Sequence, residues 1–95
     1  MRADEHRLET LADLLDSGRT PIEALGDLER LGGAIARWAR PLITGVRSGA
    51  PLGMILAQAG LLSSPELIWV GGAEHAGRAS SLRVVSAQRR ARRSR

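Results

Sequence analysis

The residues whose side chains could most readily take part in a reaction lie near position 74, where an acid and a histidine are adjacent among small residues. Glu74 and His75 stand within the run from Ala73 to Arg78. A carboxylate and an imidazole can exchange protons with a substrate or bind a metal ion. Neighbouring side chains of a helix point about 100° apart, however, so these two do not converge on one substrate atom. We therefore expect no catalytic residue here, and the chain is predicted not to be an enzyme.

Metal-binding and phosphate-binding patterns are equally weak. His6 is the only other histidine, and the chain contains no cysteine. Without a third ligand at helical spacing we expect no metal site and no cofactor. Gly71, Gly72 and Gly77 lack the preceding strand and the Lys-Ser or Lys-Thr of a phosphate loop. We interpret these glycines as points of close helix packing.

Glu74 is an isolated acid on a predicted apolar helix face. In a helix over residues 63–77, Leu67, Val70 and Glu74 share one side. A buried, unpaired charge is costly, so one interpretation pairs Glu74 with Arg78 or makes it a cap for the next helix. The other makes it a contact for a partner or an ion. If Glu74 is a buried anchor, Glu74→Gln is predicted to cost about 1–3 kcal/mol.

The elements that would position these residues are all helical. Apolar residues recur at helical spacing, and no useful length of chain alternates with a period of two. The expected helices cover about 8–17, 21–31, 34–47, 51–59, 63–77 and 79 onward. The sequence therefore predicts an all-α fold, a compact six-helix bundle with short inter-helix turns.

Local signals refine three of these helices. Thr20–Glu23 supplies an N-cap, a proline at the first helical position and a capping-box glutamate. Ser63–Glu66 offers either a cap from Ser64 or a capping box from Ser63. Pro41 predicts a kink or break in the third helix. Leu31 is expected to face inward, as are Ile35, Trp38, Ala39, Leu42 and Val46.

Charge is distributed unevenly along the chain. Residues 1–30 hold four Arg and eight acidic residues, whereas residues 78–95 hold seven Arg and no acid. The acidic side chains of the first two helices form either a solvated face or a docking patch for a basic partner. They are Asp13, Asp16, Glu23, Asp27 and Glu29.

We assign residues 1–88 to the helical domain and residues 89–95 to a basic tail. Three interpretations of the tail stay open: a patch for nucleic acid or anionic lipid, a juxtamembrane segment, or a frayed and solvated end. Its arginines are Arg89, Arg90, Arg92, Arg93 and Arg95. Trp38 and Trp69 are both expected in the core, although an exposed Trp69 would mark a docking surface.

Four segments in order resemble the cytoplasmic domain of the type II secretion F family, which includes the GspF and PilC inner-membrane platform proteins and Tad pilus relatives. They are Leu11–Gly18, Pro21–Leu25, Gly49–Leu52 and, as the fourth, Gly60–Leu62 together with Ala73–Arg78. The sequence departs from the family at Ala73, where a glycine is usual, and at Ala79, where a leucine is usual. The resemblance implies a structural role for Gly18, Pro21, Ala24, Leu25, Gly49, Leu52, Glu74 and Gly77.

The resemblance also implies a function. Such a domain would be a non-enzymatic scaffold on the cytoplasmic face of the bacterial inner membrane. It would dock the secretion or pilus assembly ATPase and other inner-membrane platform proteins, with a possible homo-oligomer and with membrane association only through chain not present here. The expected partner surface comprises Asp13, Asp16, Glu23, Asp27, Trp69 and Glu74. The alternative is a small helical nucleic-acid-binding module that uses the arginine tail.

Overall fold

The structure, a computed structural model, describes residues 2–93, with side chains from residue 5 onward. Over this range seven α-helices follow one another: α1 (Arg2–Asp16), α2 (Pro21–Arg30), α3 (Gly33–Arg47), α4 (Leu52–Gln58), α5 (Ser64–Trp69), α6 (Ala73–Ala76) and α7 (Ala79–Arg93). These residues contain no β-strand, which confirms the all-α prediction. The predicted count of six helices differs because the expected fifth helix is divided into α5 and α6.

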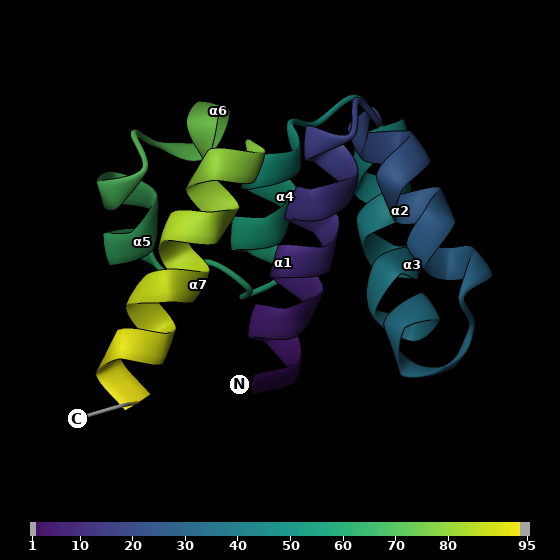
Figure 1. The fold of residues 1–95 in the computed structure, drawn as a ribbon. Coiled ribbons are helices and arrows are strands. Elements are labelled where there is room, and N and C mark those ends of the chain that lie inside the picture. Colours follow the sequence, from purple (N-terminus) through teal and green to yellow (C-terminus); the bar gives the residue numbers. More distant parts are fainter. Residues whose placement is uncertain (1, 94–95) are drawn as a thin grey trace.

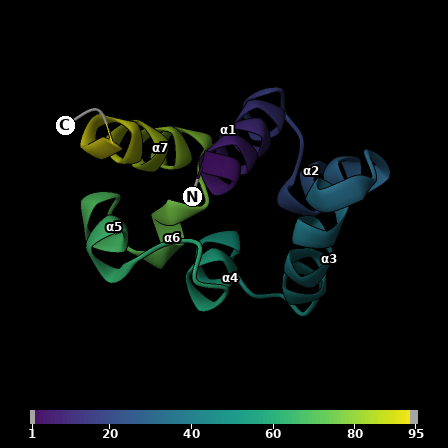
Figure 2. The same ribbon diagram turned by 90° about the horizontal axis from the view of Figure 1, so that it is seen from below.

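The helices form two sides of a small bundle. In Figure 2, α7, α1 and α2 lie along one side, and α5, α4 and α3 lie along the other. The first and last helices, α1 and α7, run antiparallel and side by side, so both ends of the described chain lie at the same end of the bundle (Figure 1). The antiparallel neighbours α2 and α3 form a hairpin beside them.

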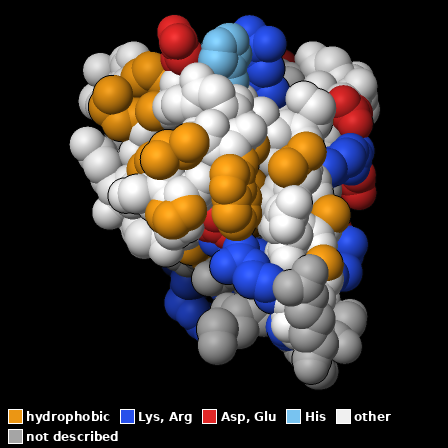
Figure 3. Space-filling model, turned by 90° about the vertical axis from the view of Figure 1, so that its left-hand side faces the viewer, with side chains coloured by type: hydrophobic (Ala, Val, Ile, Leu, Met, Phe, Trp, Pro, Cys, Tyr) orange, Lys and Arg blue, Asp and Glu red, His pale blue; other side chains and the backbone are white. Residues whose placement is uncertain are grey.

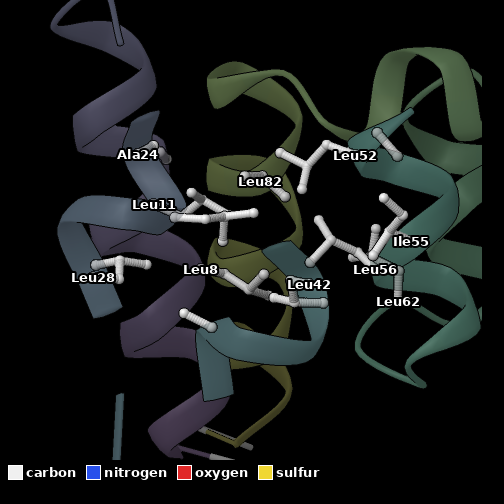
Figure 4. Close-up of a cluster of buried hydrophobic side chains, with 14 of the residues drawn as sticks. Leu8, Leu11, Ala24, Leu28, Leu42, Leu52, Ile55, Leu56, Leu62 and Leu82 are labelled. Carbon is white, nitrogen blue, oxygen red and sulfur yellow. The ribbon is translucent and has the colours of Figure 1, made fainter. Parts of the chain in front are cut away.

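Leucines from five of the helices, α1, α2, α3, α4 and α7, and from the turn after α4 meet between the two sides (Figure 4). Leu8, Leu11, Leu25, Leu28 and Leu56 are fully buried. Removing one such side chain from water stabilises the fold by roughly 1.5–3 kcal/mol. The largely aliphatic core explains why a chain with only two aromatic residues still closes around one interior.

Most residues of the family resemblance lie at helix boundaries or in this core. Gly18 and Gly49 follow α1 and α3 with φ +96° in both cases, a conformation that side chains with a Cβ rarely adopt. Pro21 begins α2, where Thr20 and Glu23 form the predicted capping box. The remaining buried members are Ala24, Leu25 and Leu52.

The predicted helix over residues 63–77 is wrong in its middle. Gly71 and Gly72 have φ values of +90° and +95°, which no α-helix can contain. The chain therefore ends α5 at Trp69, turns, and begins the single turn of α6 at Ala73. Close packing was the expected role of these two glycines, but they serve the turn instead.

Of the kink or break predicted at Pro41, the break is wrong. Helix α3 continues through Pro41, and this residue lies on the exposed side, where the carbonyl that loses its partner can reach water. The fully buried face is centred on Ala36, Ala39, Leu42 and Ile43, so Trp38 is only partly buried. Leu31 is 69% exposed after the end of α2, which contradicts the inward position expected for it.

Candidate functional site

Glu74 is exposed and does not sit in the core. Its side chain is 82% accessible, and its Oε1 lies 3.9 Å from His75 Nε2. Because the turn at Gly71 and Gly72 reorients the chain, Glu74 no longer continues the apolar side of Leu67 and Val70. The expected buried anchor is therefore wrong. Within residues 2–93 no three acidic or histidine side chains gather in a way that could hold a metal ion.

Two glycines instead bring α4 and α6 into backbone contact. A Cβ added to Gly53 would overlap the Ala73 carbonyl oxygen and lie 2.9 Å from Ala76 Cβ. A Cβ on Gly77 would lie 2.9 Å from the Gly53 nitrogen and 3.0 Å from Leu52 Cβ. The packing role predicted for Gly77 is thus confirmed, whereas Gly53 was missed because nothing in the local sequence shows which helix faces it.

Glu66, at the start of α5, is a buried acid, with 3% of its surface exposed. Ser63 and Glu66 form the capping box: the Ser63 N–H donates to Glu66 Oε1 at 2.8 Å, and the Glu66 N–H donates to Ser63 Oγ. From α7, Arg89 Nε donates to Glu66 Oε2 at 2.7 Å and Arg89 Nη2 to Glu66 Oε1 at 2.8 Å. Arg89 Nη2 also donates to the Leu61 carbonyl oxygen. One guanidinium therefore fastens both α5 and the turn before it to α7.

Burial on its own would raise the pKa of Glu66. Hydrogen bonds from Arg89 and from the Ser63 N–H oppose that effect and lower the pKa from 4.5 to about 2. The folded state therefore favours the carboxylate more strongly than the unfolded chain does.

We expect acid to remove this stabilisation in a defined window. Because the pKa is depressed on folding, the contribution is complete above about pH 4.5 and is lost as the pH falls towards 2. Urea unfolding of the wild type and of Glu66→Gln at several pH values checks this. The difference between their free energies of unfolding should shrink as the pH falls through that window. A difference of constant size would contradict it.

The arginines at the end of α7 belong to the folded bundle. The helix extends to Arg93, so the chain is not frayed over residues 89–93. Arg90 pairs with Glu9 and Arg93 pairs with Glu5, both on α1. Arg92 Nη2 lies 3.7 Å from Glu66 Oε2. Arg95 lies outside the described residues.

The acidic residues of the first two helices are paired as well. Asp13 and Asp16 on α1 both accept hydrogen bonds from Arg83 of α7, at 2.8–3.0 Å and 2.6 Å. With the contacts of Glu5 and Glu9, these form an antiparallel series of ion pairs along α1 and α7. These acids therefore stabilise the contact between α1 and α7. The arginines of α7 offset much of the negative charge on which the docking-patch interpretation depended.

On α2 the acids serve local structure. Arg19 donates to both Asp27 oxygens, at 2.8 and 2.9 Å, and this hydrogen bonding lowers the pKa of Asp27 and raises that of Arg19. The Thr20 N–H, which donates to Glu23 within the capping box, is the main cause of the lowered pKa of Glu23. Both carboxylates thus remain charged in mildly acidic solution.

A surface hollow of about 270 Å³ lies between α2 and α3. Its lining comprises Arg19, Ile22, Glu23, Gly26, Glu29, Arg30, Ile43 and Arg47. Asp27 pairs with Arg30 as well as Arg19, and Glu29 Oε2 lies 3.4 Å from Arg40 Nε. Of these pairs, Glu29 and Arg40 join α2 to α3, whereas the pairs of Asp27 lie within α2 and the turn before it.

The largest departure from the predicted core is at the end of α5. Ile68 is 77% exposed and Trp69 is 50% exposed. Because Glu66 is the residue that α5 buries, Ile68, two positions later, points the other way. The Arg92 guanidinium carbon lies 5.4 Å from the centroid of a Trp69 ring. The core position predicted for Trp69 is wrong, because this side chain is exposed.

Figure 3 views the side of the molecule that carries α5, and hydrophobic side chains are spread over this face above a group of arginines. We refer to Ile68, Trp69 and Arg92 as the α5 patch. Sequence periodicity could not reveal it, because the patch depends on where α5 stops.

Searches of protein-family models, curated proteins and solved structures found no match to this chain. Among the helices of residues 2–93, none combines the length and the apolar character needed to cross a membrane.

Proposed function

We propose that this chain is a non-enzymatic interaction domain of a secretion or pilus platform, similar to the cytoplasmic domains of the type II secretion F family. The observation that carries the proposal is the contact between α4 and α6. Two segments that resemble the family, Gly49–Leu52 and Ala73–Arg78, lie more than 20 residues apart in the sequence. In the fold they adjoin through Leu52, Gly53 and Gly77. A shared packing requirement is a physical reason for both patterns to occur in one chain.

On this proposal the domain acts by presenting surfaces, at the cytoplasmic face of the bacterial inner membrane. Its partners are the assembly ATPase and other platform proteins. Of the residues first expected at the interface, Asp13, Asp16, Glu23 and Asp27 accept hydrogen bonds within the chain. Trp69 and Glu74 are exposed and form no such hydrogen bond to an arginine of the described chain, so we place the partner surface at these two residues.

The test is direct binding between this domain and the secretion or pilus ATPase encoded by the same genome. Isothermal titration calorimetry should show saturable binding with a stoichiometry of 1:1 or a symmetric multiple of it. The dissociation constant should be in the micromolar range, which corresponds to a binding free energy of about −8 kcal/mol. Absence of binding to the ATPase and to the full-length platform proteins would contradict the proposal.

Nucleic-acid binding, the alternative, has less support from the surface. Arg89, Arg90 and Arg93 all contact acids of the same chain, and phosphate binding would have to compete with these pairs. We expect no binding of duplex DNA by fluorescence anisotropy at about 150 mM salt. Tight binding that survives at that salt concentration would favour the alternative over the platform proposal.

A further inference from the structure

The α5 patch has the composition of a small protein-docking site. It combines two exposed apolar side chains of α5 with a guanidinium above an aromatic ring. Tryptophan and arginine are the residue types that contribute most often to binding energy at protein interfaces. Exposed apolar surface of this kind is common at contact sites, and here it adjoins a cation.

The charge of the patch indicates what it would bind. Arg89 already forms two hydrogen bonds to the Glu66 carboxylate, and Arg92 approaches the same carboxylate only to 3.7 Å. The side chain of Arg92 is 56% exposed. Its charge is therefore less completely satisfied than that of Arg89, and an incoming carboxylate beside Trp69 would complete its hydrogen bonding.

From this arrangement we propose that the α5 patch docks a helix of a protein partner that presents an apolar side chain next to an acidic one. The apolar side chain would pack on Ile68 and Trp69, and the carboxylate would pair with Arg92. The inference rests on the proposed function in that it assigns this helix to the assembly ATPase.

An anionic membrane fits the patch less well. Stable attraction to such a surface takes a cluster of several unpaired basic residues, each contributing roughly 1 kcal/mol. Here Arg83, Arg89, Arg90 and Arg93 each contact at least one carboxylate of the chain. The single guanidinium of Arg92 therefore suits one carboxylate better than it suits an anionic membrane surface.

A second copy of the chain is also a poor occupant. In a two-fold symmetric contact centred on Trp69, the patch would face its own copy. The two Arg92 side chains would then approach each other, and like charges at short distance oppose association. An acidic partner has no such conflict.

The first experiment measures ATPase binding by isothermal titration calorimetry with paired variants. Trp69→Ala should weaken binding about 10- to 30-fold, and Arg92→Glu about 10-fold or more. The controls are Leu31→Ser, another exposed apolar residue, and Arg37→Glu, another exposed arginine, both remote from α5. These should leave the affinity within about twofold. Thermal unfolding of each variant establishes that the fold is retained.

A second probe separates the inference from the proposed function. It is a synthetic helical peptide with a leucine stripe flanked by glutamates, compared with the same peptide carrying lysines instead. In a Trp38→Phe background, which leaves Trp69 as the sole tryptophan, the acidic peptide should shift the fluorescence to shorter wavelength and the basic peptide should not. Sedimentation with vesicles containing phosphatidylglycerol tests the membrane directly.

The outcomes are distinct. ATPase binding that is lost in the patch variants supports the inference. ATPase binding that is unchanged in those variants overturns it and leaves the proposed function standing. A response to the acidic peptide without ATPase binding supports the α5 patch as a site for an acidic helix and refutes the assignment of that helix to the ATPase. Vesicle binding that needs Trp69, or no response to either protein probe, overturns the inference.

Discussion

Substitution of Gly53 by alanine should destabilise this protein more than any other single-methyl addition in its helices. The new Cβ would overlap the Ala73 carbonyl oxygen, and a backbone atom cannot rotate away as a side chain can. The helices α4 and α6 would have to separate, which opens the core beside Leu52 and Ala76. Overpacking of this kind costs about 3 kcal/mol or more. Thermal unfolding followed by circular dichroism should show a midpoint lower by at least 10 °C, at roughly 4–8 °C per kcal/mol.

Gly26→Ala is the matched control. Gly26 also lies inside a helix, but the nearest atom to its added Cβ is Arg30 Nη1 at 3.8 Å, an ordinary contact at the end of a flexible side chain. Alanine should therefore be neutral or stabilise α2 by up to about 1 kcal/mol. Equal stability changes for Gly53→Ala and Gly26→Ala would show that α4 and α6 do not pack as described.

Glu66→Gln should cause the second large loss, about 3 kcal/mol. The amide can keep part of the capping box, but it leaves the Arg89 guanidinium, which is 21% exposed, without its carboxylate. Breaking one partner of a buried ion pair is expensive because the remaining charge stays desolvated. The measurement is the free energy of unfolding in urea at pH 7.

Two further variants define the origin of that loss. Adding Arg89→Gln to Glu66→Gln should cost less than the sum of the single changes, because the orphaned charge is removed. Glu74→Gln should leave stability unchanged, since that side chain is 82% exposed. Additive losses in the double variant would contradict the buried pairing of Glu66 with Arg89, and a large loss at Glu74 would contradict the exposed position of that side chain.

Helix starts and much of the core were predictable because they depend on near neighbours. The capping boxes of α2 and α5 need residues only three positions apart, and both formed as the spacing indicated. Leu8, Leu11, Leu25 and Leu28 follow a helical period that any buried helix face would show. These features require no knowledge of the tertiary fold.

The features that sequence reasoning missed depend on distant contacts or on backbone conformation. Glu66 and Arg89 are 23 positions apart, and nothing local identifies their pairing. The consecutive glycines at 71 and 72 could signal either close packing or a turn, and only their positive φ values decide between the two. Once the turn forms, Glu74 leaves the core and Trp69 reaches the surface. One wrong helix boundary therefore accounts for both errors in the predicted site.

The antiparallel contact between α1 and α7 has a consequence for biosynthesis. Arg83 and Asp13 are 70 positions apart, and Arg93 and Glu5 are 88 apart, so the first helix finds its neighbour only when the last one has been made. Until α7 has emerged from the ribosome, Leu8 and Leu11 remain partly uncovered. The contact between α1 and α7 therefore forms late, and such long-range closure slows folding relative to helical proteins held together by local contacts.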